Sequence, residues 1–192
     1  LKELGTKDLR IIKDEMLQET AENIKKALGE NAYTIFRLTP EEYNSRHVEY
    51  KNIHNLLGLG HSTVIKELMS RVECEDVFTE RFGKDNIIQD FLKGFEKPVK
   101  VKQVIRSDRF AAVAAASIIA RAEIAKWFEE INAKYNSELT KGASMNVAQH
   151  ALPLIEEHSP AIINEIAKMH FKTTRKLEKR FGLTIIPREQ QD

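Results

Sequence analysis

Several residue types and patterns are scarce in this chain of 192 residues, and each shortage excludes a class of protein. The single cysteine, Cys74, excludes an internal disulfide and a zinc site built from several thiolates, so we expect an ordinary buried thiol. No stretch approaches the roughly 18 consecutive apolar residues that a membrane-spanning helix needs. Nothing at the start resembles a secretory signal, and we therefore expect a cytoplasmic protein.

Charge is nearly balanced, with 30 basic and 29 acidic residues and a formal net charge of +1. A net charge this small does not indicate a polyanionic partner, so any contact with nucleic acid depends on where the charges lie. Residues 168–188 contain one acid, Glu178, and these basic residues: Lys168, Lys172, Arg175, Lys176, Lys179, Arg180 and Arg188. This segment can form a cationic face.

Apolar periodicity indicates an α/β protein in which helices and strands alternate. With 42% apolar residues the chain can bury one sizeable core, so we expect a single domain over residues 1–192. Helices are expected at residues 12–28, 52–72, 86–95 and 108–135, and a C-terminal helical segment at about 141–182. Alternating β-branched and aromatic residues predict strands at 32–38, 76–82 and 99–105.

The clearest local signal is a helix start just after residue 38. Thr39 is a good N-cap, Pro40 suits the first helical position, and Glu42 stands where a capping box needs its acid. We therefore expect a short helix to begin at Pro40.

The most distinctive string covers residues 107–121 and reads SDRFAAVAAASIIAR. Ser107 is a good N-cap, and the alanines raise helix propensity and leave room for a neighbouring element. Asp108 stands at the head of this helix, where the helix dipole and free N–H groups keep a carboxylate ionised and able to hold a hard divalent cation. By spacing alone, a simple helix cap is the stronger interpretation of Asp108.

The whole string favours a metal ligand over a simple cap. It resembles the motif with which type-2 ribonucleases H begin their main helix, an acid followed by VAAASIIAR. Further strings occur in the order seen in ribonuclease HIII: LGTKDLR at 4–10, EYN at 42–44, KNIH at 51–54, His61, KGAS at 141–144 and HFKTT at 170–174. Each string alone is weak. Their order carries the resemblance.

This resemblance implies a ribonuclease H-like mixed sheet flanked by helices, with a helix-rich C-terminal part, and cleavage of the RNA strand of RNA/DNA hybrids. It also implies Mg²⁺ or Mn²⁺ held by four acids, because paired cations about 4 Å apart activate water and stabilise the leaving oxygen. Asp108 and Glu80 are the catalytic and metal-binding candidates. The substrate-binding candidates are Asp8, Arg10, Asn52, Lys141, Gly142, Ser144, His170, Lys172, Thr173 and Thr174. For the residues of the KGAS and KTT strings the alternative is caps and a solvated face, and for His170 it is an ordinary core or surface histidine.

The chain departs from the family pattern at three places. The family's first strand, which carries an Asp-Glu pair, has no counterpart before residue 4, so we expect an N-terminally incomplete domain. Aligning Phe82 with the family's IDQF-like string puts Glu80 at the third acid, where the extra methylene displaces the carboxylate by about 1 Å or more. DLR at residues 8–10 replaces Asp-Ser-Lys and loses a hydroxyl.

Two functions therefore stay open. The first is a metal-dependent endonuclease acting on RNA/DNA hybrids. The second is a catalytically inactive ribonuclease H-like domain that binds nucleic acid or a protein partner, which the missing acids and the basic end favour. In either case we expect a monomer with no membrane partner.

Overall fold

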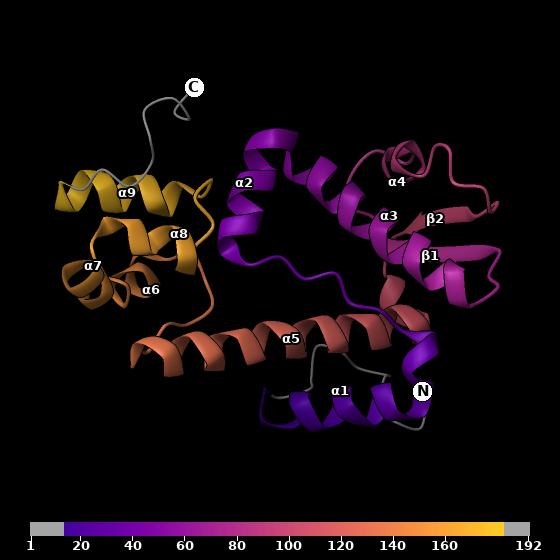
Figure 1. Cartoon of the computed structure of the whole chain (residues 1–192), viewed down its shortest axis with the longest axis horizontal. Coiled ribbons are helices and arrows are strands. Elements are labelled where there is room, and N and C mark those ends of the chain that lie inside the picture. The colour runs from indigo at the N-terminus through magenta and orange to yellow at the C-terminus, as the bar shows by residue number, and fades with distance from the viewer. Residues whose placement is uncertain (1–13, 183–192) are drawn as a thin grey trace. The chain divides into compact units, whose positions relative to one another are not determined.

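A computed structural model of the chain describes residues 14–182 (Figure 1). The chain divides into two compact units, and each has a hydrophobic core of its own. The first unit comprises residues 1–36 and 53–125, and the second comprises residues 37–52 and 126–192. Within residues 14–182, no helix is both long and apolar enough to span a membrane.

One core cluster of the first unit lies between α1 (Asp14–Leu28) and the first part of α5 (Ala111–Tyr135). Leu17, Ile24 and Ile118 are fully buried there. The small side chains Ala115 and Ala122 are buried in the same cluster, as the alanine-rich string predicted. Burying one such large apolar side chain contributes about 1.5–3 kcal/mol, so this cluster favours the packing of α1 on α5.

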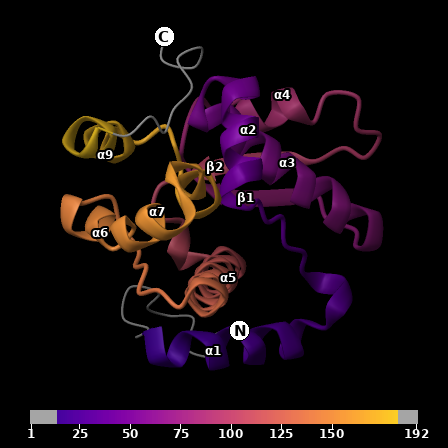
Figure 2. The same cartoon turned by 60° about the vertical axis from the view of Figure 1, so that its left-hand side comes forward.

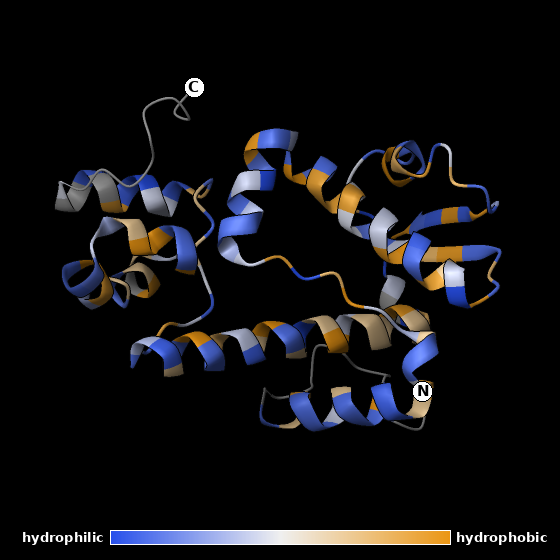
Figure 3. Ribbon diagram, viewed as in Figure 1, coloured by the Kyte–Doolittle hydropathy of each residue, from blue (hydrophilic) through white to orange (hydrophobic). Residues whose placement is uncertain are grey.

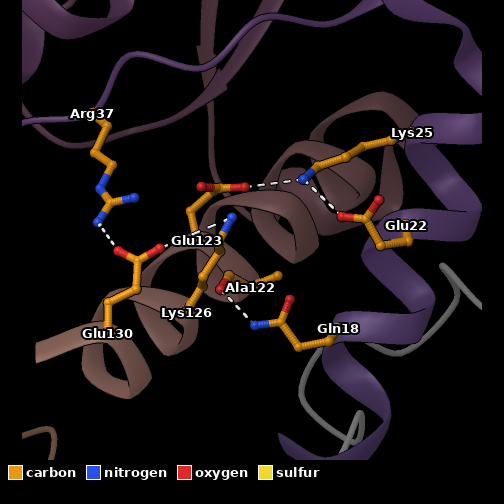
Figure 4. A network of polar contacts seen from close by, with 8 residues as sticks. All are labelled: Gln18, Glu22, Lys25, Arg37, Ala122, Glu123, Lys126 and Glu130. Carbon is orange, nitrogen blue, oxygen red and sulfur yellow. Dashed lines mark hydrogen bonds and ion pairs between the residues drawn. The ribbon is translucent and has the colours of Figure 1, made fainter. Parts of the chain in front are cut away.

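Polar contacts add to the packing of α1 on α5 (Figure 4). The amide of Gln18 donates to the carbonyl of Ala122 over 3.0 Å. The ammonium of Lys25 donates to the carboxylates of Glu22 and Glu123, each over 3.0 Å. In the second unit, Figure 4 shows Glu130 of α5 accepting from Arg37 over 2.9 Å.

Among its described residues, the first unit has a sheet of two parallel strands, β1 (Asp76–Glu80) and β2 (Lys100–Val104). Their register pairs Asp76 with Lys100 and Glu80 with Val104. Helices α3 (Ile53–Arg71) and α4 (Ile87–Phe91) pack with the strands through a second apolar cluster of buried residues: Ile65, Met69, Ile88 and Leu92. The C-terminal ends of the two strands therefore stand side by side.

The strand expected at residues 32–38 is absent from the described structure. A 3₁₀ turn covers Glu30–Ala32, Tyr33 is extended, and residues 33–38 form no strand. The guanidinium of Arg71 donates to the carbonyls of Glu30 and Tyr33. Alternating residues favour an extended backbone, but a strand also needs a hydrogen-bonded neighbour, and the described residues supply none here. The sheet within residues 14–182 is accordingly parallel rather than mixed.

The second unit is helical. Besides the end of α5 it contains α2 (Pro40–Tyr50), α6 (Met145–Gln149), α7 (Leu152–His158), a 3₁₀ turn (Pro160–Ile162), α8 (Ile163–Ile166) and α9 (Lys172–Phe181). Its core centres on Leu154, Ile155 and Ile163, with Trp127 packed against them. Figure 2 shows α6, α7 and α9 gathered in one group.

Two local expectations had opposite outcomes. The capping box at Thr39 is confirmed, because its side chain accepts from the amide of Glu42 and the Glu42 carboxylate accepts from the amide of Thr39 over 2.8 Å. The expectation of a buried thiol was wrong. Cys74 is exposed, and its thiol donates to the carbonyl of Asp76 over 3.1 Å, because it lies in the connection before β1 rather than on a packed face.

Candidate functional site

The strongest candidate site in the first unit is formed by the end of β1 and the turn that precedes α5. Glu80 is the last residue of β1, and the 3₁₀ turn Ser107–Arg109 follows β2. One carboxylate oxygen of Glu80, Oε2, accepts from the amide of Ser107 over 2.9 Å and also from the Ser107 hydroxyl. Glu80 therefore holds the turn that contains residue 108.

Aromatic stacking fastens the same turn to β1 at a second point. Phe78, two residues before Glu80, stacks on Phe110 with ring centroids 4.4 Å apart and planes 20° from parallel. Since residues two apart in a strand point to one face, Phe78 and Glu80 hold the turn from the same side of β1. Lys102 and Arg109 lie over this aromatic pair, at 5.3 Å from the Phe78 ring centroid and 5.0 Å from that of Phe110.

Hydrogen bonding also sets the charge of Glu80. Its bonds from the Ser107 side chain, from the Ser107 amide and from the backbone of Arg106 hold the pKa of the carboxyl below its ordinary value. The side chain is exposed, and water and these donors together keep it ionised at neutral pH. An ionised carboxylate is the ligand that a hard divalent cation prefers.

The structure places the other predicted metal ligand, Asp108, in the turn held by Glu80, but the side chain of Asp108 lies outside the described atoms. The residue seen to face Glu80 is its neighbour Ser107. Among the side chains that the structure describes, no group of three or more His, Cys, Asp or Glu could hold a metal ion. Glu80 thus fits a cation as one ligand, and the described residues do not complete the set.

Buried polar residues near the sheet were missed by the sequence reasoning. Gln103 of β2 is buried, accepts from the amide of Phe82 over 3.4 Å and donates to the carbonyl of Lys84 over 2.7 Å. The Gln103 side chain therefore fixes the backbone at residues 82 and 84, just after Glu80. No clear signal for it is present in the sequence, because β2 reads KVKQV and its polar residues do not mark which of them is buried.

In the second unit, two of the predicted substrate-binding strings come together. The hydroxyl of Thr173 at the start of α9 donates to the carbonyl of Ala143, within the loop that carries Lys141, Gly142 and Ser144. Ser144 caps α6 by accepting from the amide of Val147 over 3.2 Å. Gly142 has a φ of 135°, a conformation that side-chain-bearing residues rarely adopt. The Ser144 cap, the Thr173 contact and the Gly142 conformation therefore fix the backbone of this loop.

The faces of α9 differ in character. Lys172, Arg175, Lys176 and Lys179 are exposed, whereas Leu177 is buried and Thr174 is only 4% exposed. Figure 3 shows this helix as mainly hydrophilic. The exposed lysines and arginine can meet a phosphate backbone directly, while the buried Thr174 supports the packing of the helix.

His170 packs against α2 of the second unit. Its ring stacks on His47 of α2 with centroids 4.5 Å apart, and its Nδ1 is 3.4 Å from the hydroxyl of Tyr43. Burial, together with the nearby His47 and Lys168, lowers the pKa of His170. Asn52 is exposed just before α3. Asp8 and Arg10 lie outside the described residues.

Comparisons with known proteins identify relatives over most of the chain. The family model for ribonuclease HII matches residues 1–174. Ribonuclease HIII of Protochlamydia amoebophila is 30% identical over 173 residues, which are 90% of this chain and 56% of that protein. Ribonuclease HIII of Chlamydia muridarum is 27% identical, over 90% of this chain and 57% of that protein. The chain spans a little more than half the length of these curated relatives.

Solved structures show the same fold. Bst-RNase HIII in complex with Mn²⁺ has a TM-score of 0.81 and 23% identity, covering 93% of this chain and 59% of that one. RNase H3 of Aquifex aeolicus has a TM-score of 0.55 and 20% identity, covering 78% of this chain and 55% of that one. These likenesses confirm the expected ribonuclease H-like α/β fold, including the helix-rich C-terminal part.

Proposed function

The chain belongs to the ribonuclease HII family, and from this premise we propose that it carries part of an endonuclease that cleaves the RNA strand of RNA/DNA hybrids. Mg²⁺ or Mn²⁺ is the proposed cofactor. The observation that carries the proposal is the ionised Glu80 carboxylate at the end of β1, bonded to the turn that contains Asp108. Acids on two elements that meet at one strand end suit a cation-dependent phosphodiester hydrolysis.

Glu80 and Asp108 are the proposed metal ligands of this chain. When bound, the cation activates water and stabilises charge on the phosphate. The contribution of Glu80 is a carboxylate already ionised and held by donors from Ser107, so it does not have to be reorganised when a cation arrives. A paired-ion site needs further carboxylates, and the described side chains supply no group of three or more ligands.

Substrate binding is proposed for the second unit and for residues near the start of the chain. Lys141, Gly142 and Ser144 offer a charge, an amide and a hydroxyl from one loop, and Thr173 fastens that loop to α9. The proposed set is Asp8, Arg10, Asn52, Lys141, Gly142, Ser144, His170, Lys172 and Thr173. Thr174 was also a candidate from the sequence, but it is 4% exposed and packs α9 instead of facing a ligand. Contacts of this kind position the phosphate backbone, and 2′-hydroxyl contacts select RNA.

Incubation of an end-labelled RNA/DNA hybrid with the gene product that contains this chain, with Mn²⁺ or Mg²⁺, tests the proposal. We expect cuts in the RNA strand only, and a loss of at least about 100-fold in rate for Asp108→Ala or Glu80→Gln. Asp90→Ala is the matched control, because Asp90 is an acid of α4 that pairs with Lys93 over 2.9 Å. Cleavage that survives Asp108→Ala unchanged refutes the proposed role.

A second function is favoured by one specific observation. Lys172, Arg175, Lys176 and Lys179 are exposed on α9, and these cations can bind a polyanion without any metal site. A domain that binds hybrid or a protein partner without cutting it is consistent with this arrangement. Salt-sensitive hybrid binding with no cleavage under any divalent cation supports this alternative over the nuclease.

A further inference from the structure

Buried polar side chains gather where the strands end in the first unit. Thr79, Gln103 and Ser107 are all less than 10% exposed, and they belong to β1, β2 and the turn that follows β2. Of these, Ser107 is the one that bonds to Glu80. Ser107 is 3% exposed, and a buried polar group is tolerated only when it is hydrogen-bonded, so its hydroxyl depends on the bond to Glu80.

From this contact we infer that Ser107 is a positioning residue that holds the Glu80 carboxylate in the orientation in which it binds a divalent cation. The inference rests on the proposed nuclease function and deepens it. Ser107 itself does not touch the cation. Its hydroxyl and amide occupy acceptor sites on Oε2, and a carboxylate has about four acceptor sites in all, so capacity for a cation remains.

The surrounding backbone is built to keep this contact in place. Arg106, directly before Ser107, adopts φ 54° and ψ 53°, a left-handed conformation that costs a side-chain-bearing residue free energy. The Phe78–Phe110 stack holds the residue that follows the turn against β1. Strain of this kind persists only where neighbouring contacts determine the conformation, and the bonds from Ser107 to Glu80 are made by the residue that follows Arg106.

A positioning role makes a specific prediction about the chemistry of residue 107. A hydrogen-bonding partner of a metal ligand typically contributes about 10- to 100-fold in metal affinity. Ser107→Ala removes the hydroxyl and keeps the amide, so it should weaken Mn²⁺ binding by about tenfold. Ser107→Thr keeps the hydroxyl and should bind Mn²⁺ within about threefold of the unsubstituted chain.

The experiment measures the Mn²⁺ dissociation constant by electron paramagnetic resonance, with far-UV circular dichroism to confirm folding. Ser62→Ala is the matched control, because Ser62 is also a buried serine of the first unit but donates to the carbonyl of Leu59 in its own helix. If Ser107→Ala does not fold, Ser107→Cys, which retains a weak donor, replaces it with the same expected direction.

The decisive comparison is made in a Glu80→Gln background. If Ser107 acts through Glu80, Ser107→Ala should change Mn²⁺ affinity by less than about twofold once that carboxylate is gone. Equal affinity of Ser107→Ala and the unsubstituted chain overturns the positioning role and leaves the proposed function standing. Absence of both Mn²⁺ binding and hybrid cleavage in the unsubstituted protein overturns the proposed function, and the inference with it.

Discussion

The imidazole rings of His47 and His170 stack with centroids 4.5 Å apart and planes 15° from parallel. They join α2 to the segment just before α9, both in the second unit. Lys168 lies 4.4 Å from the ring centroid of Tyr43, so a cationic group faces the same cluster. The stack therefore holds two ionisable rings at a distance where they cannot both carry charge cheaply.

The first prediction concerns acid stability. Burial lowers the pKa of both His47 and His170 from the ordinary value of 6.5, and the neighbouring His47 and Lys168 lower that of His170 further. The unfolded chain therefore binds more protons than the folded chain below about pH 6.5, so stability should rise with pH through that window and level off above it. Thermal unfolding followed between pH 5 and 8 measures this.

The matched variants for this prediction are His170→Gln and His150→Gln. His170→Gln removes one of the stacked rings and should flatten the pH dependence. His150→Gln is the control, because His150 is exposed and lies outside the stack, with its Nδ1 2.8 Å from the carbonyl oxygen of Glu138. This substitution should leave the pH dependence of stability unchanged. A pH profile that is identical in His170→Gln and the unsubstituted chain would contradict the role of the stack.

The second prediction compares two ion pairs. Lys25 and Glu123 join α1 to α5 with side chains only 16% and 20% exposed. Burial opposes the charge of Lys25, but hydrogen bonds from its ammonium to Glu123 and Glu22 raise its pKa on balance. Glu123→Gln removes one of the two carboxylates that offset the burial of the Lys25 ammonium. It should lower the free energy of unfolding by about 1–3 kcal/mol. Urea unfolding measures the difference.

Glu130→Gln is the control for that comparison. Its partners Arg37 and Lys126 are largely exposed, and solvent screens such pairs, so no measurable loss is expected. Equal effects of the two substitutions would show that burial at Lys25 does not matter.

The third prediction uses two glycines of α3. A Cβ at Gly58 would lie 2.9 Å from the Phe91 ring, whereas a Cβ at Gly60 would lie 3.4 Å from the Phe36 ring. Both Gly→Ala changes gain helix propensity, but only the first forces a neighbour to move. Gly58→Ala should therefore be less stable than Gly60→Ala by about 1–3 kcal/mol in chemical unfolding. The reverse order would mean that the Phe91 ring moves aside without cost.

The fourth prediction concerns the basic helix. If α9 meets the phosphate backbone, Lys172→Gln should weaken binding to hybrids of any sequence and lower the slope of log affinity against log salt by about 1. Lys93→Gln is the control, because Lys93 is equally an exposed lysine but pairs with Asp90 in the first unit. Fluorescence anisotropy over a salt series distinguishes the two, and an unchanged slope for Lys172→Gln would remove α9 from the interface.

Local sequence signals predicted the elements that depend on near neighbours. The capping box of Thr39 and Glu42, the helical spacing in residues 52–72 and the alanine string after residue 110 each specify a helix through contacts within a few residues. The strands at 76–80 and 100–104 formed close to their expected bounds. The strand expected at 32–38 did not form, because a strand needs hydrogen bonds from a neighbouring strand, and local sequence does not specify that neighbour.

The candidate site divides in the same way. The ordered strings identified the family and pointed to Glu80 and Asp108, and the family model confirms the family resemblance. The roles of the site residues, the single domain, the monomeric state and the cytoplasmic location stay predictions. Sequence did not predict that Ser107 faces Glu80, because they are 27 positions apart.

By itself, then, the sequence determined the family, the helices with strong local signals and the basic character of residues 168–180. Only the tertiary structure decided that Glu80 meets Ser107, that His170 stacks on His47 and that Cys74 is exposed. The physical reason is the separation in sequence over which each interaction acts. Caps and helical periodicity act over a few residues, whereas hydrogen bonds and stacking between distant segments exist only once packing has brought those segments together.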